Sequence, residues 1–130
     1  MREDSRHNPD TIDYTGTIAP ASTTTVYSEE IDLNQKWNRS VWVELAGAGT
    51  VDVRVFYVVA YWDEATNTFS DFVEQEEGSD LINNVEDTNL HNVSLHPNVS
   101  DRIKIGFEGQ GSNGADVTVA DLRISFGGVE

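Results

Sequence analysis

The chain has 130 residues, a net charge of −15 at pH 7 and no cysteine. This length is typical of one domain that buries enough apolar surface to fold without crosslinks. The lack of cysteine excludes disulfides, thiolate metal sites and a cysteine nucleophile, and the negative charge disfavours contact with nucleic acids and anionic membranes.

The amino-terminal region differs in composition from the rest of the chain. Residues 1–22 carry charged side chains, Asn, Pro and Thr, with few large apolar side chains, although Ile12, Tyr14 and Ile18 are spaced so that they could form a strand. This composition predicts a flexible N-terminal arm over residues 1–22 that becomes ordered on a partner. An ordinary frayed terminus is the alternative interpretation.

The next part of the chain has the β-branched content and the alternation of strands. The first strands are expected within residues 23–33 and at 41–45, where every second side chain is apolar. A glycine-rich turn at 47–50 leads into a long strand over residues 51–62. Its second half is apolar on both faces, so we expect it to be covered on both sides. The apolar run from Val55 to Trp62, at about eight residues, is too short to span a bilayer.

The second half of the chain alternates short strands with polar turns. Strands are expected at 69–73, 89–95, 102–108 and 116–126. Between them we expect a polar turn at 63–68, an acidic loop at 74–84 and a glycine-rich hairpin loop at 109–114. A brief strand or helical turn around Leu81 and Ile82 would interrupt the acidic loop. In the last strand the apolar side chains fall on odd-numbered positions before Ala120 and on even-numbered positions from Ala120 onward. This change predicts either a strand that is apolar on both faces or a β-bulge near Ala120.

These strands are closely spaced, and no segment has a convincing helical period. About seven or eight such strands predict an all-β fold, an antiparallel β-sandwich that is jelly-roll-like. We therefore expect a single β-sandwich domain over residues 23–130, preceded by the arm.

No group of residues has the pattern of a catalytic site. The chain contains neither a serine nucleophile elbow nor a zinc-binding helix motif. His91 and His96 do not share a strand face, and nothing positions Asp101 beside them. The glycine loop at 109–114 superficially matches a dinucleotide-binding pattern, but no βαβ unit surrounds it. We expect no enzymatic activity and no cofactor, with a structural calcium held by acidic loops as the alternative.

The three tryptophans are candidate contact residues. Trp42 falls on the polar face of its strand, Trp37 lies in a polar stretch, and Trp62 lies where a strand meets its turn. Exposed aromatic rings anchor protein interfaces or stack on sugar rings. The alternative is that Trp42 and Trp62 cover the core or a sheet edge. Trp37 is the best candidate for partner contact, followed by Trp42.

Several segments between Tyr27 and Phe126 carry a resemblance to a known group. The first is Tyr27–Leu33, and the second is Val41–Val51, which reads as a strand, a G-x-G-T turn and another strand. The third is Val58–Asp63, a strand whose loop leads to Phe69. The last is a closing hairpin made of Asp101–Gly109 and Ala115–Leu122. In these segments the chain resembles the small β-sandwich virion proteins of tailed phages that decorate, cement or join the head shell. The Glu-rich loop and the strong acidity depart from that group.

The resemblance implies a non-enzymatic structural protein of the virion, made in the host cytoplasm. Its partners would be the capsid protein, further copies of itself, or both, and not nucleic acid or membrane. The arm would add a strand to a neighbour's sheet, anchored by Ile12, Tyr14 and Ile18. Head decoration, a head–tail adaptor and a fibre component all remain open.

A carbohydrate-binding, lectin-like sandwich is the main alternative. It would use Trp37, Trp42 or Trp62, with or without calcium. A small enzyme on the same scaffold is the third hypothesis.

Overall fold

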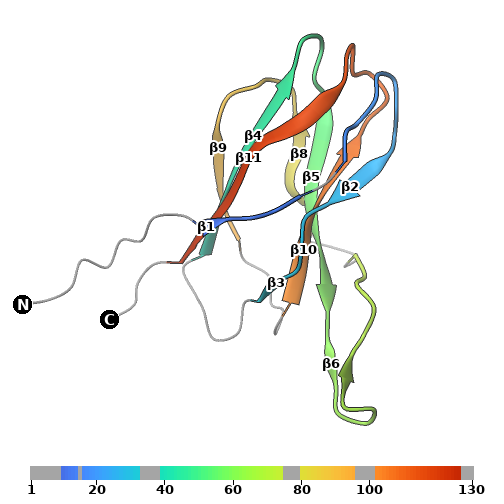
Figure 1. The fold of residues 1–130 in the computed structure, drawn as a ribbon, viewed down its shortest axis with the longest axis vertical. Coiled ribbons are helices and arrows are strands. Elements are labelled where there is room, and N and C mark those ends of the chain that lie inside the picture. Colours follow the sequence, from blue (N-terminus) through green and yellow to red (C-terminus); the bar gives the residue numbers. More distant parts are fainter. Residues whose placement is uncertain (1–9, 15, 33–38, 75–79, 96–101, 127–130) are drawn as a thin grey trace, which may run out of the picture.

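The computed structural model describes residues 10–14, 16–32, 39–74, 80–95 and 102–126, and every regular element within these ranges is a strand. The strands form two antiparallel sheets and a small two-stranded hairpin (Figure 1). Core side chains from both sheets pack against one another. The predicted all-β antiparallel sandwich is therefore confirmed.

The first sheet has four strands in the order β1-β11-β4-β9. These are β1 (Asp10–Thr11), β11 (Val117–Phe126), β4 (Arg39–Gly47) and β9 (His91–Ser94). The pairing of β11 with β4 shifts register between Val119 and Asp121, which confirms a β-bulge near Ala120. Because of this shift, Val119 before the bulge and Leu122 after it both face the core.

The second sheet has five strands, with β10 and β5 at its centre. They are β2 (Thr25–Tyr27), β3 (Ile31–Asp32), β10 (Arg102–Gly109), β5 (Val53–Ala60) and β8 (Asp80–Val85). β2 and β3 pair with successive parts of one edge of β10, while β5 lies between β10 and β8. β8 confirms the brief strand expected around Leu81 and Ile82, although it begins at Asp80 and runs to Val85, so it takes up the second half of the acidic loop expected at 74–84.

The small hairpin consists of β6 (Trp62–Asp63) and β7 (Thr68–Phe69) and continues the line of β5 beyond the sandwich (Figure 1). The strand expected at 69–73 is shorter than predicted, since β7 ends at Phe69. The described residues form eleven strands, more than the predicted seven or eight, because several extra strands have only two residues each. Such short pairings carry too few residues to leave a clear alternation in the sequence.

The core lies between the two sheets. Along β5 and β10 every second side chain points inward, which is the two-residue period of a pleated strand. The inward residues of these two strands are Val53, Val55, Tyr57, Val59, Ile103, Ile105 and Phe107. Their partners from β4 and β11 are Val41, Val43, Leu45, Val117, Val119, Leu122 and Ile124. Removing this apolar surface from water is the main contribution to stability.

The outer face of the second sheet is also covered along β5. Phe56, Val58 and Ala60 point away from the core cluster but are buried, as expected for the half of the strand that is apolar on both faces. Phe56 is paired with Gly106 of β10, where an added Cβ would come within 2.5 Å of the ring. Glycine at that position leaves room for the ring, and the Arg54 guanidinium lies 4.3 Å from the ring centroid on the same face.

Truncation of Phe107 tests this description of the core. Phe107 is the largest of the fully buried side chains. We expect Phe107→Ala to lower the free energy of unfolding by about 3–5 kcal/mol, because it leaves a cavity between the sheets. Urea denaturation measures the loss. The control Leu90→Ala removes a side chain that is half exposed and should change stability by no more than about 0.5 kcal/mol. Similar losses in both variants would contradict the assignment.

Candidate functional site

The described part of the N-terminal segment lies along one side of the sandwich and pairs with the edge of β11. β1 pairs with the end of β11, and the Ile12 amide donates to the Leu122 carbonyl at 2.9 Å. Further along, Ile18 and Val117 exchange two backbone hydrogen bonds of 2.9 and 2.8 Å. These contacts add the segment to the first sheet as an edge strand.

The same segment also pairs with the second sheet. Tyr14 forms an isolated antiparallel bridge with Ser28, which follows β2. Beside it, the Glu29 amide donates to the Asp13 carbonyl at 2.9 Å. The segment thus makes backbone bonds with both sheets on the side where β11 and β2 lie.

We call residues 10–14 and 16–18 the N-terminal clasp. Because the clasp pairs with strands of both sheets, it belongs to the sandwich. The sandwich therefore includes residues on the N-terminal side of the boundary predicted after residue 22. Of the predicted arm over residues 1–22, residues 1–9 and residue 15 lie outside the described residues.

The two isoleucines of the clasp are part of the chain's own core. Ile12 is 3% exposed and Ile18 is 2% exposed, and both pack in the cluster between the sheets. Tyr14 is partly buried against the same cluster. In this structure Ile12, Tyr14 and Ile18 are held by their own sandwich, and their predicted role as anchors on a neighbour stays a prediction. The isoleucines fill the space between β11 and the chain after β2, and we call this space, occupied here by the clasp, the groove.

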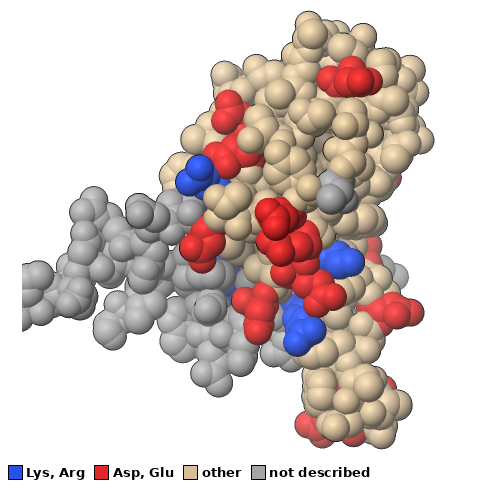
Figure 2. Space-filling view, in the orientation of Figure 1, with Lys and Arg blue, Asp and Glu red and all other residues tan. Residues whose placement is uncertain are grey.

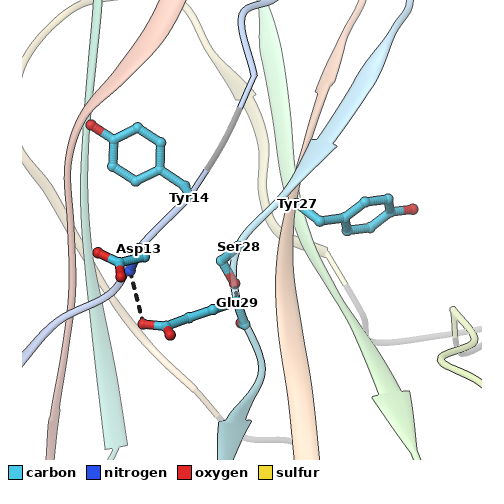
Figure 3. A pocket seen from close by; sticks show the side chains of 5 residues that line it. All are labelled: Asp13, Tyr14, Tyr27, Ser28 and Glu29. Atoms are coloured by element: carbon cyan, nitrogen blue, oxygen red, sulfur yellow. Dashed lines mark hydrogen bonds between the residues drawn. The ribbon is translucent and has the colours of Figure 1, made fainter.

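A hollow of about 180 Å³ lies where the clasp meets the second sheet (Figure 3). It is lined by Asp13, Tyr14, Tyr27, Ser28 and Glu29. The Asp13 amide donates to Oε2 of Glu29 at 2.9 Å, which is the dashed bond in Figure 3. The buried Ser28 hydroxyl donates to the Glu29 carbonyl at 2.8 Å and accepts from the Ile105 amide at 2.9 Å. The protein itself therefore satisfies the buried hydroxyl of this hollow.

Carboxylates gather on the surface around this junction, and Figure 2 shows them as a red cluster near the middle of the face. The exposed acidic residues of this part of the chain are Asp13, Glu29, Glu30 and Asp32. Glu30 is paired with Arg102 at 3.3 Å. Within the described ranges, no three His, Asp or Glu side chains are close enough to hold a metal ion. A structural calcium stays a prediction.

The hairpin β6–β7 carries exposed aromatic side chains beyond the end of the sandwich. Tyr61 is 40% exposed and Trp62 is 43% exposed. Trp62 packs edge-on against Phe69 across the hairpin, with their ring centroids 5.1 Å apart. The turn is held by the Ala65 amide, which donates to Oδ1 of Asp63 at 2.9 Å, a bond that aspartate commonly makes in turns. The hairpin therefore presents aromatic surface on an ordered turn.

Contacts with the second sheet fix the base of this hairpin. Val73, on the returning chain, exchanges two backbone hydrogen bonds of 2.8 Å with Val59 of β5. On the outer face, the Arg102 guanidinium lies 4.1 Å from the Phe69 ring centroid. A cation over an aromatic face is attracted by the negative charge density of the ring. Both contacts restrict movement of the hairpin relative to the sheet.

A cluster of charges holds the end of the returning chain. The Arg54 guanidinium contacts Glu74, Asp80 and Glu108, with Nε to Oδ1 of Asp80 at 2.7 Å and Nη1 to Oε1 of Glu108 at 3.2 Å. Burial alone lowers the pKa of Arg54, but hydrogen bonds to the three carboxylates outweigh it and raise that pKa above its ordinary value. Arg54 thus ties Glu74 and Asp80 to the outer face of β5.

A second hollow, of about 160 Å³, lies on this outer face. Its walls are Tyr27, Val58, Phe72 and Lys104. The Lys104 ammonium nitrogen is 4.7 Å from the Phe72 ring centroid. The hollow therefore combines aromatic walls with a single cation.

Of the other two tryptophans, Trp42 lies in the described part of the chain and Trp37 does not. Trp42 lies on the outer face of β4, paired with Arg123 of β11 on one side and Asn92 of β9 on the other. It is half-buried, and its Nε1 donates to the Ser125 hydroxyl at 3.3 Å. Trp42 therefore covers the sheet and offers only part of its ring to a partner. Trp37 lies outside the described residues.

Of His91 and His96, which the sequence analysis considered as a pair, His91 lies in the described part of the chain and makes a surface contact. His91 Nε2 donates to Oδ1 of Asp87 at 2.8 Å. This bond, together with one from the Asn89 amide, holds the pKa of the Asp87 carboxyl below its ordinary value. His96 and Asp101 lie outside the described residues.

Comparison with models of known protein families finds no match, and comparison with curated proteins finds none. The resemblance to phage virion proteins therefore stays a prediction. Among the residues that the structure describes, no helix has the length and apolar character needed to cross a membrane.

Stability measurements on the clasp test its place in the core. We expect Ile12→Ala and Ile18→Ala each to lower the free energy of unfolding by about 2–5 kcal/mol, because each empties a buried site between the sheets. The matched control is Thr17→Ala, an exposed position of the same segment, with a change of at most about 0.5 kcal/mol. Thermal or urea unfolding provides the values. Isoleucine variants as stable as the control would mean that the clasp does not occupy the groove in solution.

Proposed function

We propose that this chain is a non-enzymatic structural protein of a phage virion, which decorates or cements the capsid through protein–protein contacts. The observation that supports this most is the hairpin β6–β7, where Tyr61 and Trp62 are exposed beyond the end of the sandwich. Large aromatic side chains supply most of the binding energy in many protein interfaces.

The attachment of the hairpin favours a binding role. An isolated two-stranded hairpin is only marginally stable in water. Here the bonds between Val73 and Val59 and the stacking of Arg102 on Phe69 connect it to the second sheet. A contact surface that is already ordered loses less conformational entropy when a partner binds. The rigid base therefore makes Tyr61 and Trp62 better anchors than the same residues on a free loop.

The charge of the chain limits the kind of partner surface. Asp63 and Glu64 follow Trp62 and are exposed, and the whole chain carries a net charge of −15. A neutral or basic protein surface with an apolar pocket complements this combination. Nucleic acids and anionic membranes would be repelled.

The size of the two hollows described above favours contact with a macromolecule over a small ligand in either of them. The two described above have volumes of about 180 and 160 Å³. Typical pockets for small ligands and cofactors measure about 300–1,000 Å³. A projecting aromatic surface therefore has more binding capacity than either hollow.

Binding to capsid shells tests the proposal. The major capsid protein encoded in the same genome is assembled into shells, mixed with this chain and separated on a sucrose gradient. We expect the wild-type chain to sediment with the shells and the Tyr61→Ala/Trp62→Ala double variant to bind about 30-fold more weakly. Leu90→Ala, also exposed but outside the hairpin, should bind like wild type. A wild-type chain that stays at the top of the gradient would contradict the proposal.

A carbohydrate-binding role is the second candidate, and the exposed ring of Trp62 favours it, because sugars stack on aromatic rings. A glycan array probed with wild type and Trp62→Ala, with and without EDTA, separates the candidates. Glycan binding that Trp62→Ala abolishes would favour the lectin, and an array without signal would remove it.

A further inference from the structure

The bonds that hold the clasp are bonds that another copy of the same segment could make. Ile12 donates to the Leu122 carbonyl, and Ile18 exchanges a pair of bonds with Val117, all between backbone atoms. Backbone pairing of this kind is how an extended segment adds to a sheet edge in many complexes. These backbone bonds, and the buried sites that Ile12 and Ile18 occupy, would be the same whichever copy of the chain supplies the segment.

The groove cannot stay empty without exposing the core. Ile12 and Ile18 are almost completely buried between the sheets. If both left, the side chains around them would face water, which is unfavourable in proportion to the apolar area exposed. A clasp that leaves its own groove must therefore be replaced by an equivalent segment, and a second copy of this chain carries one.

The turn that connects the clasp to β2 has an unfavourable backbone conformation. The Ser22 amide donates to the Ala19 carbonyl at 3.2 Å, which closes a four-residue turn with Pro20 at its second position. Ala21, at the third position, has a φ of 56°. Turns that require a positive φ there normally use glycine, because a Cβ makes this region unfavourable. Extension of residues 19–22 would relieve this strain.

We propose that the clasp exchanges between two copies of this chain, so that the clasp of one copy fills the groove between β11 and β2 of the other. Strained connecting turns favour exchange of this kind, since the exchanged form keeps every contact of the clasp and loses the turn. The inference goes beyond the proposed function, because it concerns the pure protein and needs no capsid. It also gives the N-terminal segment a neighbour to reach without leaving a core unfilled.

Disulfide trapping tests the exchange, and the absence of natural cysteine keeps it free of background. Thr11 and Arg123 are paired across β1 and β11, and both are exposed. Paired residues of neighbouring strands are close enough for a disulfide. Thr11→Cys and Arg123→Cys chains are unfolded together, refolded at high concentration and oxidised. We expect a covalent heterodimer on a non-reducing gel, with the bond located by mass spectrometry of the linked peptides.

The control pair is Thr66→Cys with Arg123→Cys, because Thr66 is exposed in the hairpin turn and does not pair with β11. It measures crosslinking by random collision. A heterodimer yield no higher than that of the control pair would overturn the exchange. Circular dichroism of each variant before oxidation establishes that the chains are folded.

Glycine substitutions test the role of the turn. Ala21→Gly removes the strain and should lower the dimer association constant of the otherwise unchanged chain by about fivefold for each of the two turns. Ala19→Gly makes the same chemical change in the same turn at a position that lacks a positive φ. Light scattering after size-exclusion chromatography gives the dimer fraction. An equal effect of both substitutions would overturn strain in the turn as the driving force.

Discussion

Backbone pairing of the clasp with both sheets is the interaction that closes this sandwich. It holds Ile12 and Ile18 between the sheets, where they complete the core on the side of β11 and β2. Without it, that side of the sandwich would expose apolar side chains and the unpaired edge of β11 to water. An unpaired strand edge is also a site of unwanted association. A mostly polar segment, with two isoleucines and a tyrosine as its apolar side chains, thus protects one side of the fold.

The clasp and the hairpin β6–β7 are suited to different contacts. The clasp offers backbone groups and two aliphatic side chains that fit a groove of this chain itself. The hairpin offers the exposed rings of Tyr61 and Trp62 among carboxylates, which suits a neutral or basic surface of another protein. A sandwich that joins its own copies through one segment and a different protein through the other would have the contacts that a shell protein needs.

The sequence predicted the long strands well, because alternation in 41–45 and 102–108 reports directly which side chains face the core. It also located the irregularity near Ala120, where a bulge or a two-sided strand was expected and the structure has the bulge. The role of the clasp was not predictable in this way: Ile12 and Ile18 are isolated apolar residues in a polar segment, and only the groove that distant strands create makes them core residues. The stacking of Phe69 and Phe72 on Arg102 and Lys104 likewise joins segments far apart in the sequence. Local patterns carry no signal for such contacts.

Native-state amide hydrogen exchange, followed by NMR, tests the place of the clasp most directly. The amides of Ile12 and Ile18 donate to β11, and the Val117 amide donates back to the clasp. If the clasp is part of the sandwich, these three amides should exchange slowly and with similar protection, because they open only when the clasp leaves its groove. Exchange of the Ile12 and Ile18 amides at the rate of an unstructured peptide, with the Val117 amide equally unprotected, would show that the clasp does not close the sandwich.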